Sequence, residues 1–177
     1  SKNSTHVPSL AAEIETFRKS FLSQPRPVAK VLGEVARMRA RLAGAKPAKG
    51  IWDAKNGAGR MMDIELLSQA GALTSGSSAR DVRSGLDGAV AAGWLGAADA
   101  EYLSDSYALF WQVQSAARLV STKPIDSDTL GEGGARFLCR TSGHDQLAAL
   151  EQALKTRYIG SAERIDAALK MEGTDAG

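Results

Sequence analysis

Apolar residues recur every three or four positions along most of this 177-residue chain, and short breaks rich in Gly or Pro separate the periodic segments. This spacing gathers apolar side chains on one face of an α-helix. No segment alternates apolar and polar residues as a half-buried strand does, and no repeat recurs along the chain. We therefore predict an all-α fold, a helical bundle of about six to seven helices with no sheet.

The breaks predict where these helices begin and end. We expect Pro25 and Pro27 to stop the first helix and Gly44 to stop the second. Capping-box spacing from Ser78 to Asp81 precedes the fourth. The expected helices cover about residues 9–24, 27–42, 60–74, 82–93, 97–121, 134–140 and 145–170, with a break in the last at Gly160. Together they predict a single helical domain over residues 1–177, frayed at 1–6 and 171–177.

Composition excludes several classes of protein. The chain is 44% hydrophobic and 24% charged, as is usual for soluble globular domains. No apolar run approaches the roughly 20 residues of a membrane span, and no signal-peptide pattern is present. We therefore expect a cytoplasmic protein that does not bind a membrane. Cys139, the only cysteine, is expected to be a small buried apolar residue and not a nucleophile.

Charge is unevenly distributed along the chain. Residues 1–60 hold 12 Lys/Arg and 4 Asp/Glu, a net charge of +8, whereas residues 61–177 hold 10 and 16, a net charge of −6. The basic part can face an anion or an acidic partner, or the two parts can attract each other within one fold. The basic residues Arg37, Arg41, Lys46 and Lys49 have no aromatic residues between them, so we expect no binding of nucleic acid.

The segment from Lys46 to Gly59 predicts a loop that leads directly into a helix carrying Asp63 and Glu65. Two chemical interpretations remain open for this junction. Glycines, Lys55 and Arg60 beside a helix N-terminus suit a phosphate, although the spacing is neither a P-loop nor a dinucleotide fingerprint. The junction also suits helix initiation alone. A shared metal ion is excluded, because carboxylates two residues apart on a helix diverge by roughly 160°.

Helical geometry separates the polar residues of this junction into two groups. Asp63 falls within the apolar sector of its helix, as Arg39 does in the preceding one. Because a buried charge needs a partner, we predict that Asp63 is structural and meets Arg39, Lys55 or backbone N–H groups of the glycine loop. Glu65 and Gln69 point together to the other side, and they are the better candidates for contacting something outside this domain.

Other candidates carry less chemistry. Asp126 and Asp128 resemble a nucleotidyltransferase D-x-D pair, but they stand in a Pro/Gly-rich turn, so we interpret them as a helix cap. His6 and His144 have no ligand cluster around them. Three aromatic residues at helical spacing are interpreted as core or packing residues: Trp94, Phe110 and Trp111.

The junction carries a resemblance to a known family. Its stretch is similar to K-x-x-x-G-G-[LIM]-x-D-I-E-F-x-x-Q, which follows an M-R-x-[KR]-[ML] helix end in bacterial glutamine synthetase adenylyltransferases. The matching residues are Lys55, Gly59, Met61, Asp63, Ile64, Glu65 and Gln69, with Met38, Arg39, Arg41 and Leu42 upstream. Arg60 replaces the second Gly and Leu66 replaces the Phe. The match covers about residues 30–73, and Tyr107 to Val120 resembles a later family helix.

The resemblance implies a C-terminal helical domain of a larger, bifunctional enzyme that adds AMP to glutamine synthetase and removes it. Such an enzyme would use ATP and Mg²⁺ in an upstream nucleotidyltransferase domain, and would respond to glutamine and the PII signal protein. The chain shows no Gly-Ser plus D-x-D core, so the resemblance implies no catalytic residue, metal site or cofactor here, and no adenylyltransferase activity for the chain alone.

The implied role is to present part of the junction to the nucleotide cleft or to the domain interface. The candidate residues are Lys55, Gly57, Gly59, Arg60, Glu65 and Gln69. Arg39 and Asp63 are the expected structural ion pair. The alternative is a non-catalytic helical regulatory or interaction module that binds PII or glutamine synthetase.

Overall fold

The computed structural model describes residues 12–14, 16, 20, 23–78, 80–121, 124–128 and 130–170. Within these ranges the chain is helical and contains no strand, so the predicted all-α class is confirmed. The helices are α2 (Val28–Ala45), α3 (Met61–Ser75), α4 (Val82–Ala91), α5 (Ala97–Val120), α6 (Glu132–Ser142) and α7 (Leu147–Lys170). The first expected helix, over residues 9–24, lies largely outside the described residues, as do the expected frayed ends at 1–6 and 171–177.

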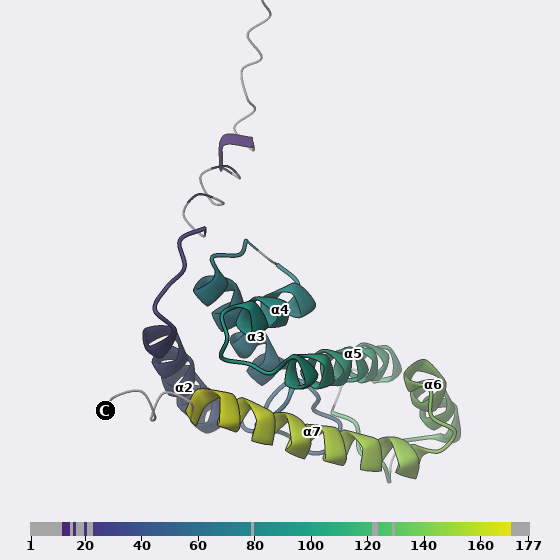
Figure 1. Cartoon of the computed structure of the whole chain (residues 1–177). Helices are drawn as coiled ribbons and strands as arrows, with labels where there is room; N and C mark the ends of the chain where they lie inside the picture. Colours follow the sequence, from purple (N-terminus) through teal and green to yellow (C-terminus); the bar gives the residue numbers. More distant parts are fainter. Residues whose placement is uncertain are drawn as a thin grey trace, which may run out of the picture.

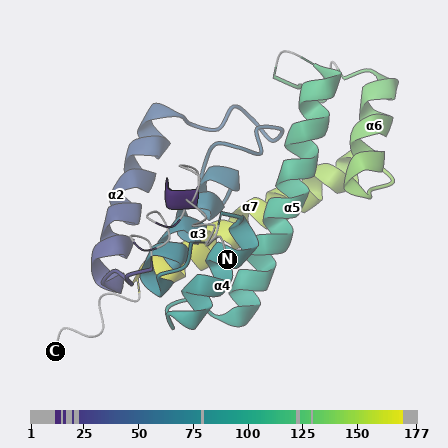
Figure 2. The same ribbon diagram turned by 90° about the horizontal axis from the view of Figure 1, so that it is seen from above.

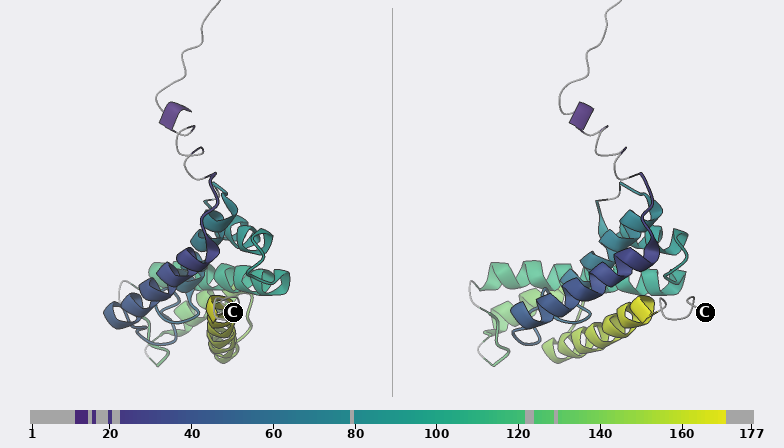
Figure 3. Two further views of the ribbon diagram at one scale, coloured as in Figure 1. Left: turned by 60° about the vertical axis from the view of Figure 1, so that its left-hand side comes forward. Right: turned by 90° about the vertical axis from the view of Figure 1, so that its left-hand side faces the viewer.

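The two longest helices, α5 and α7, form the body of the bundle (Figure 1). Seen from above, α2 lies at one end and α6 at the other, with α3 and α4 between α2 and the start of α5 (Figure 2). Two further views show α2 crossing the side of the bundle near the C-terminal end of α7 (Figure 3). Helix α7 contacts α2, α3, α5 and α6, and so joins both ends of the molecule.

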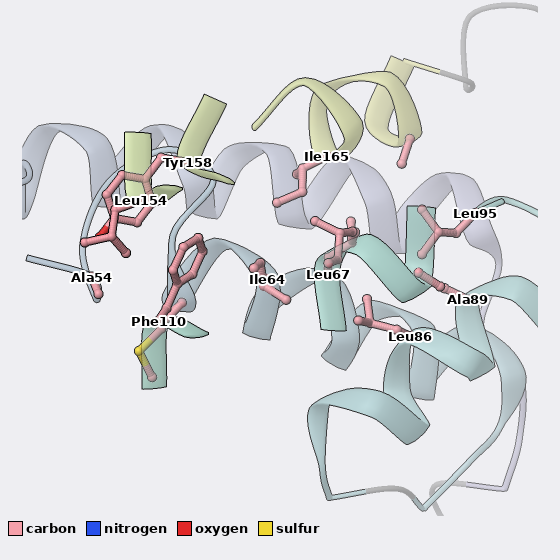
Figure 4. Close-up of a cluster of buried hydrophobic side chains, with 14 of the residues drawn as sticks. Ala54, Ile64, Leu67, Leu86, Ala89, Leu95, Phe110, Leu154, Tyr158 and Ile165 are labelled. Carbon is pink, nitrogen blue, oxygen red and sulfur yellow. The ribbon is translucent and has the colours of Figure 1, made fainter. Parts of the chain in front are cut away.

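One continuous apolar core runs along the bundle, as Figure 4 shows. Ile64 and Leu67 of α3 are completely buried at its centre, beside Ile165 of α7. Phe110 packs on the ring of Tyr158 toward one end, with ring centroids 4.7 Å apart. Each fully buried side chain of this size contributes roughly 1.5–3 kcal/mol to folding.

Helices α3 and α4 approach each other at a crossing built from glycines. A Cβ atom added at Gly71 would lie 2.0 Å from the carbonyl oxygen of Gly85, and one added at Gly85 would lie 2.1 Å from the Ser68 hydroxyl. The Ser68 hydroxyl donates to the carbonyl of Val82, which ties α3 to the first turn of α4. The helices can therefore pack this closely only because Gly71 and Gly85 have no side chain.

Several expected boundaries were wrong, each for a local reason. Gly44 does not end α2, which continues to Ala45 and stops where Lys46 precedes Pro47, because a residue before proline disfavours the helical conformation. Asp81, not Ser78, caps α4: its carboxylate accepts the backbone N–H of Ser84 at 2.9 Å.

The last two helices also differ from the predicted pattern. Helix α6 starts at Glu132 and ends at Ser142, followed by Gly143 in the left-handed conformation. Helix α7 is not interrupted at Gly160. This residue lies inside the helix and lets the ring of Tyr102 approach, since an added Cβ would lie 2.3 Å from the Tyr102 hydroxyl.

Candidate functional site

The loop between α2 and α3 is organised by one carboxylate. Asp53 accepts backbone N–H groups from Lys49 at 3.1 Å, from Asn56 at 3.1 Å and from Lys55 at 3.3 Å. Burial acts to raise the pKa of Asp53, but these hydrogen bonds, led by that from Asn56, outweigh it and lower the pKa below its usual value. Asp53 therefore fixes the loop while ionised.

Arg60, the departure from the family glycine pair, is turned into this loop. Its guanidinium donates to the carbonyl of Gly50 at 2.8 Å and to the carbonyl of Asp53, and lies 4.1 Å above the centre of the Tyr158 ring. The Tyr158 hydroxyl donates to the carbonyl of Ile51 at 3.0 Å. Arg60 is thus a cross-link between the loop and α7, and its donors are directed to the chain's own carbonyls.

Asp63 and Arg39 form a bidentate ion pair between α3 and α2. The Arg39 Nε and Nη2 atoms donate to the two Asp63 oxygens at 2.6 and 2.8 Å, and Nη1 donates to Asp166 of α7 at 2.8 Å. Burial acts to lower the pKa of Arg39, but its carboxylate partners outweigh burial and raise it. The backbone N–H of Gly59 completes the arrangement by donating to Asp63 at 2.8 Å.

Gly57 and Gly59 of the junction adopt backbone conformations with a positive φ, which favour glycine. Gly59 adopts a positive φ of 69°, and a Cβ there would lie 2.0 Å from the carbonyl oxygen of Tyr158. Gly57 has a φ of 115°. Since the Gly59 N–H is already bound by the Asp63 carboxylate, whose charge would repel a phosphate, the geometry favours helix initiation over a phosphate cradle at this point.

The other side of α3 forms a groove that combines residues from three parts of the chain. Glu65 and Gln69 of α3 line it together with Tyr107 of α5 and with Arg80 and Asp81, which precede α4. It encloses about 390 Å³. The Tyr107 hydroxyl donates to a Glu65 carboxylate oxygen at 2.8 Å. Burial and this carboxylate raise the pKa of Tyr107 to about 12, so the phenol stays protonated at neutral pH and orients Glu65.

The six junction candidates therefore lie in four different places. Glu65 and Gln69 share the groove, whereas Gly59 and Arg60 are turned into the loop and against α7. Gly57 borders a recess on the α2 side of α3, together with Arg39 and Asp63. Lys55 is exposed on the loop surface, and its side chain is not part of the groove.

The acidic pair and the aromatic residues singled out from the sequence make packing or turn contacts. The Asp126 carboxylate accepts the backbone N–H of Asp128 at 3.2 Å within a turn; α6 begins only at Glu132, so these residues are not the expected helix cap. Trp94 and Phe110 are buried in the core, whereas Trp111 is 56% exposed and is not a core residue. Trp111 follows the buried Phe110, and consecutive helical positions face different sides.

The other two candidates, Cys139 and His144, interact with residues close to them in sequence. Cys139 is buried, as predicted, and desolvation followed by the charge of Asp145 raises the pKa of its thiol. The His144 ring nitrogen Nδ1 lies 2.8 Å from the carbonyl of Ser142. His6 lies outside the described residues.

Sequence reasoning missed two features of the polar surface. Tyr107 gave no signal of its own, because a tyrosine at helical spacing is typical of packing, and its partner lies 42 positions away. A second chain of contacts runs from the Trp52 indole N–H to the Ser127 hydroxyl at 2.9 Å, and from there to Glu151. No local pattern links residues so distant in sequence.

Fold and site together define a class: an all-α domain with a groove lined by Glu65 and Gln69 and, among its described residues, no group of three or more His, Cys, Asp or Glu that could hold a metal ion. In the same ranges, no helix is both long and apolar enough to cross a membrane. Within that class, residues 29–171 match the family described as GlnD PII-uridylyltransferase, and the chain belongs to this family.

Curated relatives are bifunctional glutamine synthetase adenylyltransferase/adenylyl-removing enzymes. The protein from Rhodopseudomonas palustris (strain TIE-1) is 30% identical over 153 residues, which cover 84% of this chain and 16% of the relative. That from Mesorhizobium japonicum is 30% identical over 149 residues (82% and 15%), and that from Rhizobium meliloti 30% over 155 residues (83% and 16%). The chain thus spans about one sixth of these relatives, and the resemblance carried by the junction is confirmed.

Proposed function

We propose that this chain is a helical domain of a glutamine synthetase adenylyltransferase. It would pack against a nucleotidyltransferase domain supplied by the rest of the enzyme and support both the ATP-dependent addition of AMP to glutamine synthetase and its removal. The similarity to the bifunctional adenylyltransferases, over more than four fifths of the chain, supports this choice over the uridylyl transfer in the family's description.

The observation that carries the proposal is the placement of the motif residues Glu65 and Gln69. Both line one groove, and Tyr107 orients the Glu65 carboxylate with a hydrogen bond of 2.8 Å. A carboxylate that is already oriented loses less side-chain freedom when it accepts a hydrogen bond from a facing surface, and the neighbouring Gln69 amide can both donate and accept. The groove is therefore suited to the nucleotide cleft or the interface with the catalytic domain.

ATP and Mg²⁺ belong, in this proposal, to the catalytic domain. The described part of this chain offers no cluster of carboxylates suited to the metal, so we derive no step through it. The residues of this chain would position the partner domain. Glu65 and Gln69 would contact it, and Tyr107 would orient Glu65. Asp53 and Arg60 would hold the loop in place at the start of α3.

The test uses an enzyme that contains this domain together with its nucleotidyltransferase domain. We expect Glu65→Gln and Gln69→Ala to lower the rate of AMP transfer to glutamine synthetase about tenfold or more, since each removes a contact made in the assembled cleft. Matched substitutions of exposed residues outside the groove, Glu163→Gln and Gln112→Ala, should leave the rate unchanged. Unfolding curves confirm that each variant is folded.

The same assay decides the role of Lys55, which lies apart from the groove. A loss of AMP transfer in Lys55→Ala, but not in Lys155→Ala, would place the loop at the cleft as well. If all groove and loop variants transfer AMP at the normal rate but lose binding to PII or to glutamine synthetase, the non-catalytic interaction module replaces our proposal.

The chain alone is expected to be inactive. Incubation of the 177-residue chain with ATP, Mg²⁺ and glutamine synthetase should give no transfer of labelled AMP, because the proposal assigns the reacting groups to another domain. Transfer above the level without protein would contradict this division of labour.

A further inference from the structure

The groove beside α3 contains a carboxylate that has no cationic partner. The Glu65 side chain is partly exposed, and one of its oxygens accepts the Tyr107 hydroxyl at 2.8 Å. Its other oxygen is not buried, and in the described part of the chain it has neither a hydrogen-bond donor nor an ion pair. A group that enters the groove can therefore reach an anionic oxygen that the fold leaves without a donor.

The immediate surroundings of Glu65 do not compensate its charge. The residues three and four positions away on α3 are uncharged: Met61, Met62, Ser68 and Gln69. The partial positive charge of a helix N-terminus falls off within the first turn, whereas Glu65 is the fifth residue of α3. Arg80 lines the same groove, but within the described ranges no ion pair joins it to Glu65.

The groove as a whole has a net negative charge. Its charged lining consists of two carboxylates and one guanidinium, those of Glu65, Asp81 and Arg80. The Asp81 carboxylate already accepts the backbone N–H of Ser84 at the start of α4. A negative lining attracts a cationic donor and repels the phosphates of a nucleotide.

Gln69 supplies a second acceptor one helical turn from Glu65. Its side chain is exposed and forms no hydrogen bond with the described residues, so its oxygen is available beside the free Glu65 oxygen. A guanidinium is planar, presents several N–H donors in a fixed fork and stacks on aromatic rings, whereas an ammonium is a compact point charge. Two acceptors next to the phenol ring of Tyr107 therefore suit a guanidinium better than an ammonium.

The surface next to the groove has the character of a protein interface. Trp111 lies one turn beyond Tyr107 on the same side of α5 and is 56% exposed. Aromatic residues and arginine are enriched at interfaces between proteins. About five sixths of the curated relatives lie outside the segment that this chain matches, so in the proposed enzyme another domain is available to cover this surface.

We propose that the groove receives an arginine side chain of the nucleotidyltransferase domain, whose guanidinium donates to the free Glu65 oxygen and to the side-chain oxygen of Gln69. The identity of this partner domain rests on the proposed function. The contact places Glu65 at the domain interface and not at the nucleotide, because the carboxylate would repel the phosphates of ATP.

Ethylguanidinium and ethylurea form a matched pair of probes for the 177-residue chain. Both are planar, similar in size and rich in N–H donors, but only ethylguanidinium is a cation. We expect ethylguanidinium to shift the side-chain amide resonances of Gln69 and to bind about two- to tenfold more tightly than ethylurea, as a partly exposed charge-assisted hydrogen bond predicts. Equal affinities, or no shift with either probe, would overturn the proposal.

Two further probes test the chemistry of the partner. Ethylammonium should bind more weakly than ethylguanidinium, because it cannot span both acceptors; equal binding would refute the assignment to arginine. Adenosine represents the nucleotide without its phosphates. Tighter binding of adenosine than of ethylguanidinium would return Glu65 to the nucleotide cleft and reject the arginine contact.

A variant assigns the probe to Glu65. Glu65→Gln keeps the shape of the side chain and removes its charge, so it should abolish the preference for ethylguanidinium over ethylurea. Glu163→Gln, at an exposed position on α7, should retain this preference. If Glu65→Gln also retains it, the cation binds elsewhere and the site is rejected.

In an enzyme that contains both domains, a double-mutant cycle identifies the arginine. Replacing one arginine of the catalytic domain by glutamine should lower AMP transfer about as much as Glu65→Gln, and the two changes together should cost little more than either alone. If Glu65→Gln lowers AMP transfer but no arginine is coupled to it, the arginine contact is refuted while the proposed function stands. A preference for ethylguanidinium without any effect of Glu65→Gln on AMP transfer would contradict the proposed function and leave the cation site intact.

Discussion

Gly59 shows how little space separates the loop from α7. Its φ of 69° is unfavourable for a side chain, and an added Cβ would fall 2.0 Å from the Tyr158 carbonyl oxygen and 2.5 Å from the Ala162 nitrogen. Both neighbours are backbone atoms of a helix, so neither can move aside by a change of rotamer. The residue therefore fixes how closely the loop and α7 approach each other.

We predict that Gly59→Ala lowers the free energy of unfolding by roughly 3 kcal/mol, from left-handed strain together with overpacking. Urea denaturation measures this change. Gly44→Ala is the control, because Gly44 lies within α2 and has nothing within 4 Å of an added Cβ; it should be neutral or stabilising by up to about 1 kcal/mol. Equal effects of the two substitutions would contradict the close approach at Gly59.

At the residue scale, sequence reasoning succeeded where helical spacing alone decides direction. The spacing indicates that Asp63 turns toward the apolar sector, and the structure leaves it 7% exposed. It did not indicate that Arg60 turns into the loop, because the acceptors are the carbonyls of Gly50 and Asp53, and every residue type carries a carbonyl. Contacts of this kind depend on the path of the loop and leave no local pattern.

At the scale of the elements, the loop before α3 is held by the ionised carboxylate of Asp53, so its contribution to stability depends on pH. The folded-state pKa of Asp53 is lowered from the usual value of 3.8. The stabilisation by its hydrogen bonds is therefore complete above about pH 4 and is lost as the pH falls through the lower folded-state value.

We predict that Asp53→Asn lowers the free energy of unfolding by about 1–2 kcal/mol at neutral pH, a value reduced because Asp53 is only partly buried. The difference from the unmodified chain should shrink as the pH falls below about 4. Urea denaturation across this range tests the sign, and a difference that grows on acidification would contradict it. Asp87→Asn, on the exposed face of α4, is the control.

The existence and type of the described helices were predictable, since the apolar period extends over each of them. Their ends were less so. Gly44 is a residue type that often ends a helix, but here it lies within α2. Asp81 was expected to be the acidic member of a capping box, whereas it is itself the N-cap of α4. Helix ends are decided by single hydrogen bonds and by the residue that follows, both weaker signals than a repeated apolar spacing.

Across the whole molecule, the Arg39 guanidinium connects elements that are far apart in the chain. It binds Asp63 of α3 and Asp166 of α7, and Asp63 also accepts the Gly59 N–H of the loop. The Arg39 and Asp63 side chains are only 16% and 9% exposed. Loss of one partner would leave the other charge largely buried and unpaired.

We predict that Arg39→Met and Asp63→Asn each lower the free energy of unfolding by roughly 3 kcal/mol, and that the double substitution costs clearly less than their sum. Unfolding curves of the four proteins give the coupling. Additive effects would show that the pair is not coupled. Arg83→Met, which breaks an exposed pair with Asp87, should change stability by less than about 1 kcal/mol.

The glycine crossing of α3 and α4 restricts how the molecule can move. If α3 slid by one turn along its neighbour, Leu67 or Ser75 would replace Gly71 at a point where not even a methyl group fits. Helices α3 and α4 must therefore move together as one rigid body. The groove wall formed by α3 and by the residues that precede α4 then keeps its shape. Any opening or narrowing of the groove falls to the one remaining wall, the turn of α5 that carries Tyr107.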